Sequence, residues 1–130
     1  MSKSMLFIHN TTDSDVAVNG VIPLGAPVHG YGCGIEMTGN AVTLSPGYYL
    51  INASIVATAD AAGVVTADIY INGVASDNEA SVTATAAGLV TLPVNAIVRV
   101  PSCTTATVSF VNEGGAVTVN NISAEVVRLR

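Results

Sequence analysis

Hydrophobic and polar residues alternate along most of the chain with a period of two. In the clearest segment, from Tyr49 to Ala57, every second side chain is hydrophobic. The same pattern recurs over residues 65–71, 80–86, 92–100, 106–110 and 122–129. Alternation of this kind places one side of a β-strand on a core and the other side outward. Because no stretch keeps a period of 3.6 for the length of a helix, we predict an all-β protein.

Turn-forming residues separate these segments at about the 8–12-residue spacing of a β-sandwich. The turn pairs are Asn19-Gly20, Gly39-Asn40, Pro46-Gly47, Ala62-Gly63, Asn72-Gly73, Ala87-Gly88 and Gly114-Gly115. Asn72-Gly73 is predicted to form a tight turn, since both residue types accept positive φ. Pro93 lies inside a strand segment, and its missing N–H predicts an edge strand or a bulge. We expect one domain, residues 1–130, with about eight to ten strands.

Composition suggests that part of the surface is hidden. The chain has 130 residues, of which 50% are hydrophobic and only 10% charged, against about 25% charged in a typical soluble domain. Its mean hydropathy is +0.57. This length suits a single core. With so few charges to solvate its surface, the chain is expected to bury surface in an oligomer or a larger assembly.

Charge and hydropathy exclude two kinds of partner. Four Lys and Arg residues stand against nine Asp and Glu residues, and this balance provides no basic face for nucleic acid. The hydrophobic runs fall far short of the roughly 18 residues that span a bilayer. The apolar patch Met5 to Ile8 is also too short for a signal sequence. We therefore expect neither a nucleic-acid partner nor a membrane partner, and synthesis in a bacterial cytoplasm.

The titratable residues do not form a recognisable catalytic motif. His9 and His29, the two histidines, have no acid or nucleophile in a known motif around them, so we predict no enzyme, no catalytic residues and no cofactor. Two acidic clusters, Asp13-Ser14-Asp15 and Asp77-Asn78-Glu79, offer oxygen ligands that calcium accepts. Neither has the spacing of a known calcium loop. The prediction is therefore polar turns and no metal site.

Cys33 and Cys103 are the two cysteines of the chain. One alternative is a disulfide between them, which would stabilise the fold by about 4 kcal/mol in the chain-entropy model. A second alternative is a pair of buried thiols that act as small hydrophobic side chains. Thiols stay reduced in a cytoplasm, so the reduced or unpaired state is slightly favoured over the disulfide.

Several motifs stand in the order of the strands of a known family. Residues 45–51 contain a Pro-Gly-x-Tyr strand start, residues 68–74 a strand that ends in Asn-Gly, and residues 107–112 and 122–130 two closing strands. In this order the chain resembles the tumour-necrosis-factor-like and complement globular-head jelly rolls. The opening, Ile22-Pro23-Leu24-Gly25 followed by Gly32-Cys33-Gly34-Ile35, is similar to a bacterial and bacteriophage branch, which includes spore-surface glycoprotein tips and small virion proteins.

The resemblance implies an all-β, jelly-roll β-sandwich of the tumour-necrosis-factor-like type that forms a homotrimer. In the family, the first strand, the Pro-Gly-Tyr strand, the strand like residues 93–100 and the final strand make the inner sheet, which packs about a three-fold axis. By this analogy the candidates for the trimer core or axis are Phe7, Tyr49, Val98 and Leu129. The alternative for all four is the ordinary core of one chain.

The resemblance also suggests a function. Because the chain has neither a collagen stalk nor a membrane anchor, we predict a non-enzymatic, trimeric virion structural protein of a bacteriophage, of the capsid-decoration or head-fibre type. Its partners would be the major capsid protein or another virion protein, and its location the virion surface. Residues 1–12 would be an N-terminal anchor or the first strand. The alternative is an adhesion module that binds surface glycans or cells, with Tyr31 as its aromatic platform.

Overall fold

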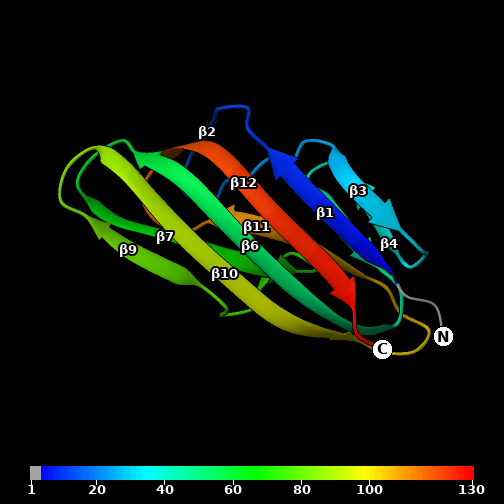
Figure 1. Ribbon diagram of the computed structural model, residues 1–130. Helices are drawn as coiled ribbons and strands as arrows, with labels where there is room; N and C mark the ends of the chain where they lie inside the picture. Colours follow the sequence, from blue (N-terminus) through cyan, green and yellow to red (C-terminus); the bar gives the residue numbers. More distant parts are fainter. Residues whose placement is uncertain (1–3) are drawn as a thin grey trace.

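The alternating segments fold into two antiparallel β-sheets, which stack as the two layers of a sandwich (Figure 1). The computed structural model describes residues 4–130, and these contain twelve strands and no helix. The strands are β1 (Met5–Asn10), β2 (Ser14–Val16), β3 (Pro27–Tyr31), β4 (Ile35–Thr38), β5 (Ala41–Leu44), β6 (Gly47–Ala59), β7 (Gly63–Ile71), β8 (Val74–Ala75), β9 (Ala80–Ala84), β10 (Gly88–Val100), β11 (Ala106–Asn112) and β12 (Val117–Arg128).

Each sheet has six strands. Sheet A has the order β10-β6-β12-β1-β3, with β2 paired to β12. Sheet B has the order β4-β5-β11-β7-β8, with β9 paired to β7. Several neighbours in each sheet come from distant parts of the sequence, as in β6 beside β12 and β5 beside β11. The all-β fold class predicted from the alternation is therefore confirmed.

The long strands of sheet A follow the predicted alternation. In β6 the side chains of Tyr49, Ile51 and Ile55 are buried, and Asn52 and Ser54 between them are exposed. β10 pairs with β6 over its whole length, from Gly88 opposite Ala59 to Val100 opposite Gly47, and places its own even-numbered hydrophobic residues in the core. The period of two thus sets which side of each strand faces sheet B.

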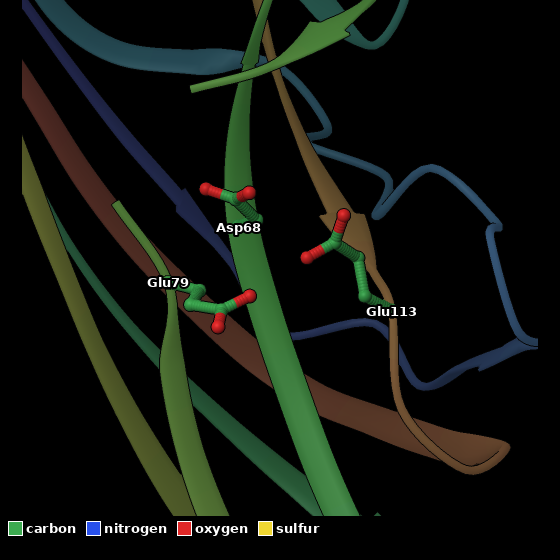
Figure 2. Close-up of side chains that lie close together, drawn as sticks. All are labelled: Asp68, Glu79 and Glu113. Carbon is green, nitrogen blue, oxygen red and sulfur yellow. The ribbon is translucent and has the colours of Figure 1, made fainter. Parts of the chain in front are cut away.

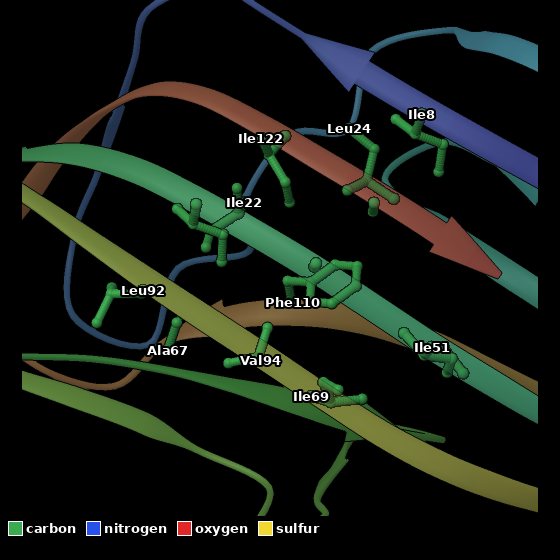
Figure 3. Packing of buried hydrophobic residues seen from close by; sticks show 14 of the residues in the cluster. Ile8, Ile22, Leu24, Ile51, Ala67, Ile69, Leu92, Val94, Phe110 and Ile122 are labelled. Carbon is green, nitrogen blue, oxygen red and sulfur yellow. The ribbon is translucent and has the colours of Figure 1, made fainter.

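The hydrophobic core lies between the two sheets. Figure 3 shows Ile51 and Ile122 of sheet A in the same layer as Ile69 and Phe110 of sheet B. All four side chains are buried, and burial of each such side chain stabilises the fold by about 1.5–3 kcal/mol. With no Trp in the chain, aliphatic residues fill most of this layer, and Phe110 is one of its few aromatic members.

Two local predictions, a tight turn and an edge strand, are confirmed. Asn72 and Gly73 form the two-residue turn between β7 and β8, with φ values of 55° and 78°. The Asn72 side chain also accepts a 2.9 Å hydrogen bond from the backbone N–H of Thr107, which fixes the turn against β11. Pro93 lies in β10, an edge strand of sheet A. An edge position tolerates its missing N–H.

The predicted number of strands, eight to ten, is wrong for the described residues because the short and exposed strands escape a hydrophobic pattern. β2 and β8 have three and two residues, too few to show alternation. β3 is exposed at every position, so its sequence carries no period. Residues 5–10 form β1 between β12 and β3, while residues 1–3 of the predicted anchor lie outside the described residues. Over residues 4–130, no helix is long and apolar enough to cross a membrane.

Candidate association surface

The outward face of sheet A carries a continuous row of hydrophobic side chains. Strand register places one residue from each of β10, β6, β12, β1 and β3 side by side across the sheet. In the first four strands this residue alternates with core positions, and β3 is the exposed edge strand. We call this set the apolar row, and its members are Ile97, Leu50, Val127, Met5 and Tyr31. Ile97 is 68% exposed at one end of the row and Tyr31 is 58% exposed at the other. An apolar stripe open to water marks a surface that gains from being covered.

The next rows of the same face are polar and small. The row beside the apolar row runs through Asn95, Asn52, Glu125, Phe7 and His29. Beyond it, Ser54 and Ser123 face each other, and their small side chains leave a shallow hollow that Phe7 and Pro93 also line. The outward face is thus apolar at one end and able to form hydrogen bonds next to it.

Two ring side chains stand beside this hollow. Phe7 and His9 point to the same side of β1, and their rings stack with centroids 6.4 Å apart. A ring nitrogen of His9, Nδ1, lies 2.7 Å from the hydroxyl oxygen of Ser123. This contact ties the ring to β12 and restricts its motion.

The Pro-Gly-x-Tyr motif fixes the end of sheet A beside the apolar row. Gly47 has a φ of 150°, and a Cβ atom there would lie 2.7 Å from the backbone oxygen of Arg130, so no larger residue fits. The Tyr49 hydroxyl donates a 2.8 Å hydrogen bond to the carbonyl of Ser45. Burial raises the pKa of Tyr49, and the nearby positive charge of Arg128 only partly opposes this. The motif therefore serves the fold of the single chain.

The four predicted core or axis residues lie in different surroundings. Tyr49 and Val98 are buried between the sheets, so they belong to the core of the single chain and do not face another subunit. Phe7 is half-buried on the outward face of sheet A, next to the apolar row. Leu129, which follows β12, is 49% exposed. The structure pairs Tyr49 with Val98 across β6 and β10 but does not gather all four side chains at one place.

Sequence reasoning missed most of the apolar row, although the sequence contains a signal for it. Leu50, Ile97 and Val127 are hydrophobic residues at positions where the alternation expects polar ones. Each breaks the pattern in a different strand, and only the strand register shows that they form a line. Tyr31, which the sequence proposed as an aromatic platform, is the exposed end of the same row.

Both cysteines are free and exposed. Cys33 lies between β3 and β4, and Cys103 lies between β10 and β11 with a φ of 66°. The alternative of two buried thiols is therefore wrong. The structure contains no disulfide between the two, and the redox state of the pair stays a prediction.

Comparison with known proteins identifies the fold. No family model and no curated protein matches the sequence. Among solved structures, murine APRIL aligns with a TM-score of 0.76 at 12% identity and covers 98% of this chain and 100% of its own. The globular domain of zebrafish complement 1qA aligns with a TM-score of 0.68 at 8% identity, over 99% of this chain and 98% of its own. PRD1 vertex protein P5 aligns with a TM-score of 0.61 at 14% identity, over 98% and 97%.

The chain has the tumour-necrosis-factor-like jelly-roll fold. The resemblance drawn from the order of the strand motifs is thereby confirmed. The strands that this resemblance assigned to one sheet, β1, β6, β10 and β12, lie side by side in sheet A. In this tumour-necrosis-factor-like jelly roll, the apolar row thus crosses sheet A, the sheet that the resemblance of the strand motifs predicts to face other subunits.

Proposed function

We propose that this protein is a non-enzymatic structural protein of a bacteriophage virion, which forms a homotrimer through the outward face of sheet A. The apolar row is the observation that carries the proposal. Ile97 and Tyr31 are large side chains that are exposed to solvent in the single chain. Burying apolar surface contributes about 25 cal/mol per Å² to the free energy of association. The polar row beside it offers hydrogen-bond partners at the rim of such an interface.

The jelly-roll fold supports a place on the virion. PRD1 vertex protein P5 shares this fold over 98% of the chain, and the opening segment is similar to the bacteriophage branch of the family. A trimer presents three copies of one contact patch, so three weak contacts to a symmetric capsid site add up through effective concentration. We propose that the trimer decorates the capsid surface, or projects from it as a head fibre, and binds the major capsid protein or another virion protein.

The position of β1 limits the proposed anchor. Residues 5–10 are hydrogen-bonded between two strands of sheet A. Ser4 is buried, its backbone oxygen accepts a 2.9 Å hydrogen bond from the N–H of Arg128, and its hydroxyl donates to the carbonyl of Cys33. Residues 4–10 are thus part of the sandwich, and we assign the anchoring contact of the N-terminal segment to residues 1–3. Removing these three residues should spare the trimer and weaken capsid attachment, whereas unchanged occupancy on purified heads would assign attachment to the sandwich.

Sedimentation velocity at micromolar concentration tests the association. The wild-type protein should sediment as three copies of the 13.1 kDa chain. The Ile97→Asp variant should sediment as a monomer, since it places a charge in the apolar row. Val74→Asp is the matched control, because Val74 is 67% exposed and lies in β8 of sheet B. A monomeric wild type, or a trimeric Ile97→Asp variant, contradicts the proposed interface.

Mass spectrometry and antibody labelling of particles from the phage that encodes the chain test its location. The protein should be present in purified virions and accessible on their surface. Its absence from the particles, together with glycan binding that Tyr31→Ala abolishes, would replace the structural role with the adhesion alternative.

A further inference from the structure

Three carboxylate side chains gather on the outward face of sheet B (Figure 2). Asp68 lies within β7, Glu79 directly precedes β9, and Glu113 directly follows β11. In the sheet, Ala67 of β7 pairs with Ala80 of β9 on one side and with Asn112 of β11 on the other. Glu79 and Glu113 therefore approach Asp68 from opposite sides of β7, as Figure 2 shows.

The spacing of these carboxylates suits a metal ion. One oxygen atom from each of the three residues lies within 4.8 Å of the other two. Calcium binds oxygen at about 2.3–2.6 Å, so an ion placed among the three can contact all of them. The three acidic side chains offer carboxylate oxygens, and such a set selects a hard cation rather than a zinc or copper ion.

Asp68 supplies a second, independent observation. Its side chain is 0% exposed. One carboxylate oxygen, Oδ1, accepts a 2.7 Å hydrogen bond from the backbone N–H of Ile69. The other, Oδ2, is buried and has no hydrogen-bond partner among the described residues. A buried carboxylate oxygen without a partner is costly, and a bound cation would satisfy it.

The charges around the cluster are negative. Burial raises the pKa of Asp68 most, backbone hydrogen bonds from Ile69 and Asp77 lower it, and the charges of Glu113 and Asp77 raise it further. A hydrogen bond to Glu113 is the largest cause that raises the pKa of Glu79, followed by burial and the charges of Glu113, Asp68 and Asp77. The Tyr70 hydroxyl donates a 2.6 Å hydrogen bond to Oε2 of Glu113, which raises the pKa of Tyr70 to about 12. A divalent cation would supply the positive charge that these groups lack.

The backbone holds Glu113 in place next to β7. Its N–H donates a 2.8 Å hydrogen bond to the carbonyl of Thr66. The buried side chain of Asn112 donates hydrogen bonds to the carbonyls of Val16, Ala17 and Gly115. A Cβ atom at Gly114 would lie 2.6 Å from the backbone of Val64 and Thr66, so only glycine allows this close approach. The position of the carboxylate is thus fixed by the fold of the β11 end.

We propose that Asp68, Glu79 and Glu113 bind a calcium ion on the outward face of sheet B. Calcium accepts six to eight oxygen ligands in flexible geometry, including bidentate carboxylates and water, whereas magnesium demands a near-ideal octahedron. Three carboxylates, one within β7 and two at the ends of β9 and β11, fit the flexible arrangement better. The ion would join β9 and β11 to β7. Because this face lies on the other sheet from the apolar row, the site is independent of the proposed trimer.

Terbium luminescence tests the site with the full-length protein. Terbium replaces calcium in oxygen sites and emits when a nearby aromatic side chain is excited. The chain has no Trp and four Tyr, and Tyr70 contacts the Glu113 carboxylate directly. We expect sensitised emission that saturates at one ion per chain and that calcium displaces. Calcium should also raise the thermal midpoint of the wild-type protein. In Tyr70→Phe the emission should be lost. Calcium should raise the midpoint of this variant too, by a smaller amount than in the wild type, because Glu113 loses a hydrogen-bond donor.

Variants distinguish binding at this site from nonspecific attraction of cations to the negatively charged protein. Asp68→Asn and Glu113→Gln should each weaken terbium and calcium binding by about tenfold or more. Asp13→Asn is the matched control, because it changes an exposed acid in the other acidic cluster of the sequence. Glu79→Gln, at an exposed position, is the second test variant if Asp68→Asn does not fold. Absent emission, undiminished binding in both Glu79→Gln and Glu113→Gln, or an equal loss in Asp13→Asn overturns the site. An equal thermal shift with magnesium overturns the choice of calcium.

Discussion

The outward faces of the two sheets differ in their chemistry although the same hydrophobic core supports both. The face of sheet A presents a row of apolar side chains from Ile97 to Tyr31. The face of sheet B collects two acids, Glu79 and Glu113, around the buried carboxylate of Asp68. Both depart from the simple rule that the outer positions of a sheet are polar and solvated. An exposed apolar stripe and a buried charge are the two departures that mark a surface with a purpose beyond folding.

The largest expected effect comes from breaking the layer that both faces share. Phe110→Ala empties a buried position in the core, and such changes cost about 3–5 kcal/mol of unfolding free energy. Phe7→Ala, on the half-exposed face of sheet A, should cost about 1 kcal/mol. Urea unfolding at one fixed protein concentration measures both. A similar cost for the two variants would show that Phe110 does not anchor the core.

The next prediction separates the two faces from each other. Ile97→Asp should abolish the trimer and leave terbium emission at the Asp68 cluster unchanged. Asp68→Asn should weaken terbium binding by about tenfold or more and leave the proposed trimer intact. Sedimentation and luminescence on the same two variants provide the measurement. If either variant loses both properties while remaining folded, the faces are coupled and the comparison between them fails.

The sequence predicts the half-buried parts of the fold and little of the exposed parts. The sequence predicts β6, β10 and β12 because one side of each strand faces the core, so hydrophobic and polar residues alternate along it with a period of two. β3 is exposed on both sides, so its residues carry no such constraint. The hairpin at Asn72-Gly73 was predicted from local turn chemistry. The fold as a whole came from the order of these motifs.

The apolar row and the carboxylate cluster around Asp68 were harder to predict, because both are formed by residues that strand pairing brings together from separate parts of the sequence. The acid cluster in the sequence, Asp77-Asn78-Glu79, contributes only Glu79, and its partners are Asp68 in β7 and Glu113 directly after β11. Likewise, no two members of the apolar row are neighbours in the chain. A pattern search finds residues that are close in sequence, whereas both surfaces depend on which strands pair and at which residue.

A smaller effect is expected from the motif at the start of β6. Tyr49→Phe removes the donor of a 2.8 Å hydrogen bond to the carbonyl of Ser45 and leaves that carbonyl unpaired, at a cost of about 1–2 kcal/mol. Tyr48→Phe is the control, since Tyr48 is the exposed neighbour, and it should change stability by about 0.5 kcal/mol or less. Urea unfolding measures the pair. The proposed trimer should persist in Tyr49→Phe, because the Tyr49 hydroxyl lies inside the chain. Loss of the trimer in this variant would place Tyr49 in the interface after all.

The smallest expected effect concerns the two cysteines, which lie in connections between sheet A and sheet B. Cys33 joins β3 to β4 and Cys103 joins β10 to β11, and both thiols are exposed and free. We expect both to react with a thiol reagent in the folded protein, and we expect the thermal midpoint to be the same with and without a reductant. A disulfide would instead stabilise the chain by about 4 kcal/mol and would lower the midpoint on reduction. The Cys33→Ser/Cys103→Ser double variant is the control, because it should match the wild type under both conditions. A reductant-sensitive midpoint in the wild type alone would reveal a covalent link between the sheets, and the two outward faces would then no longer be independent.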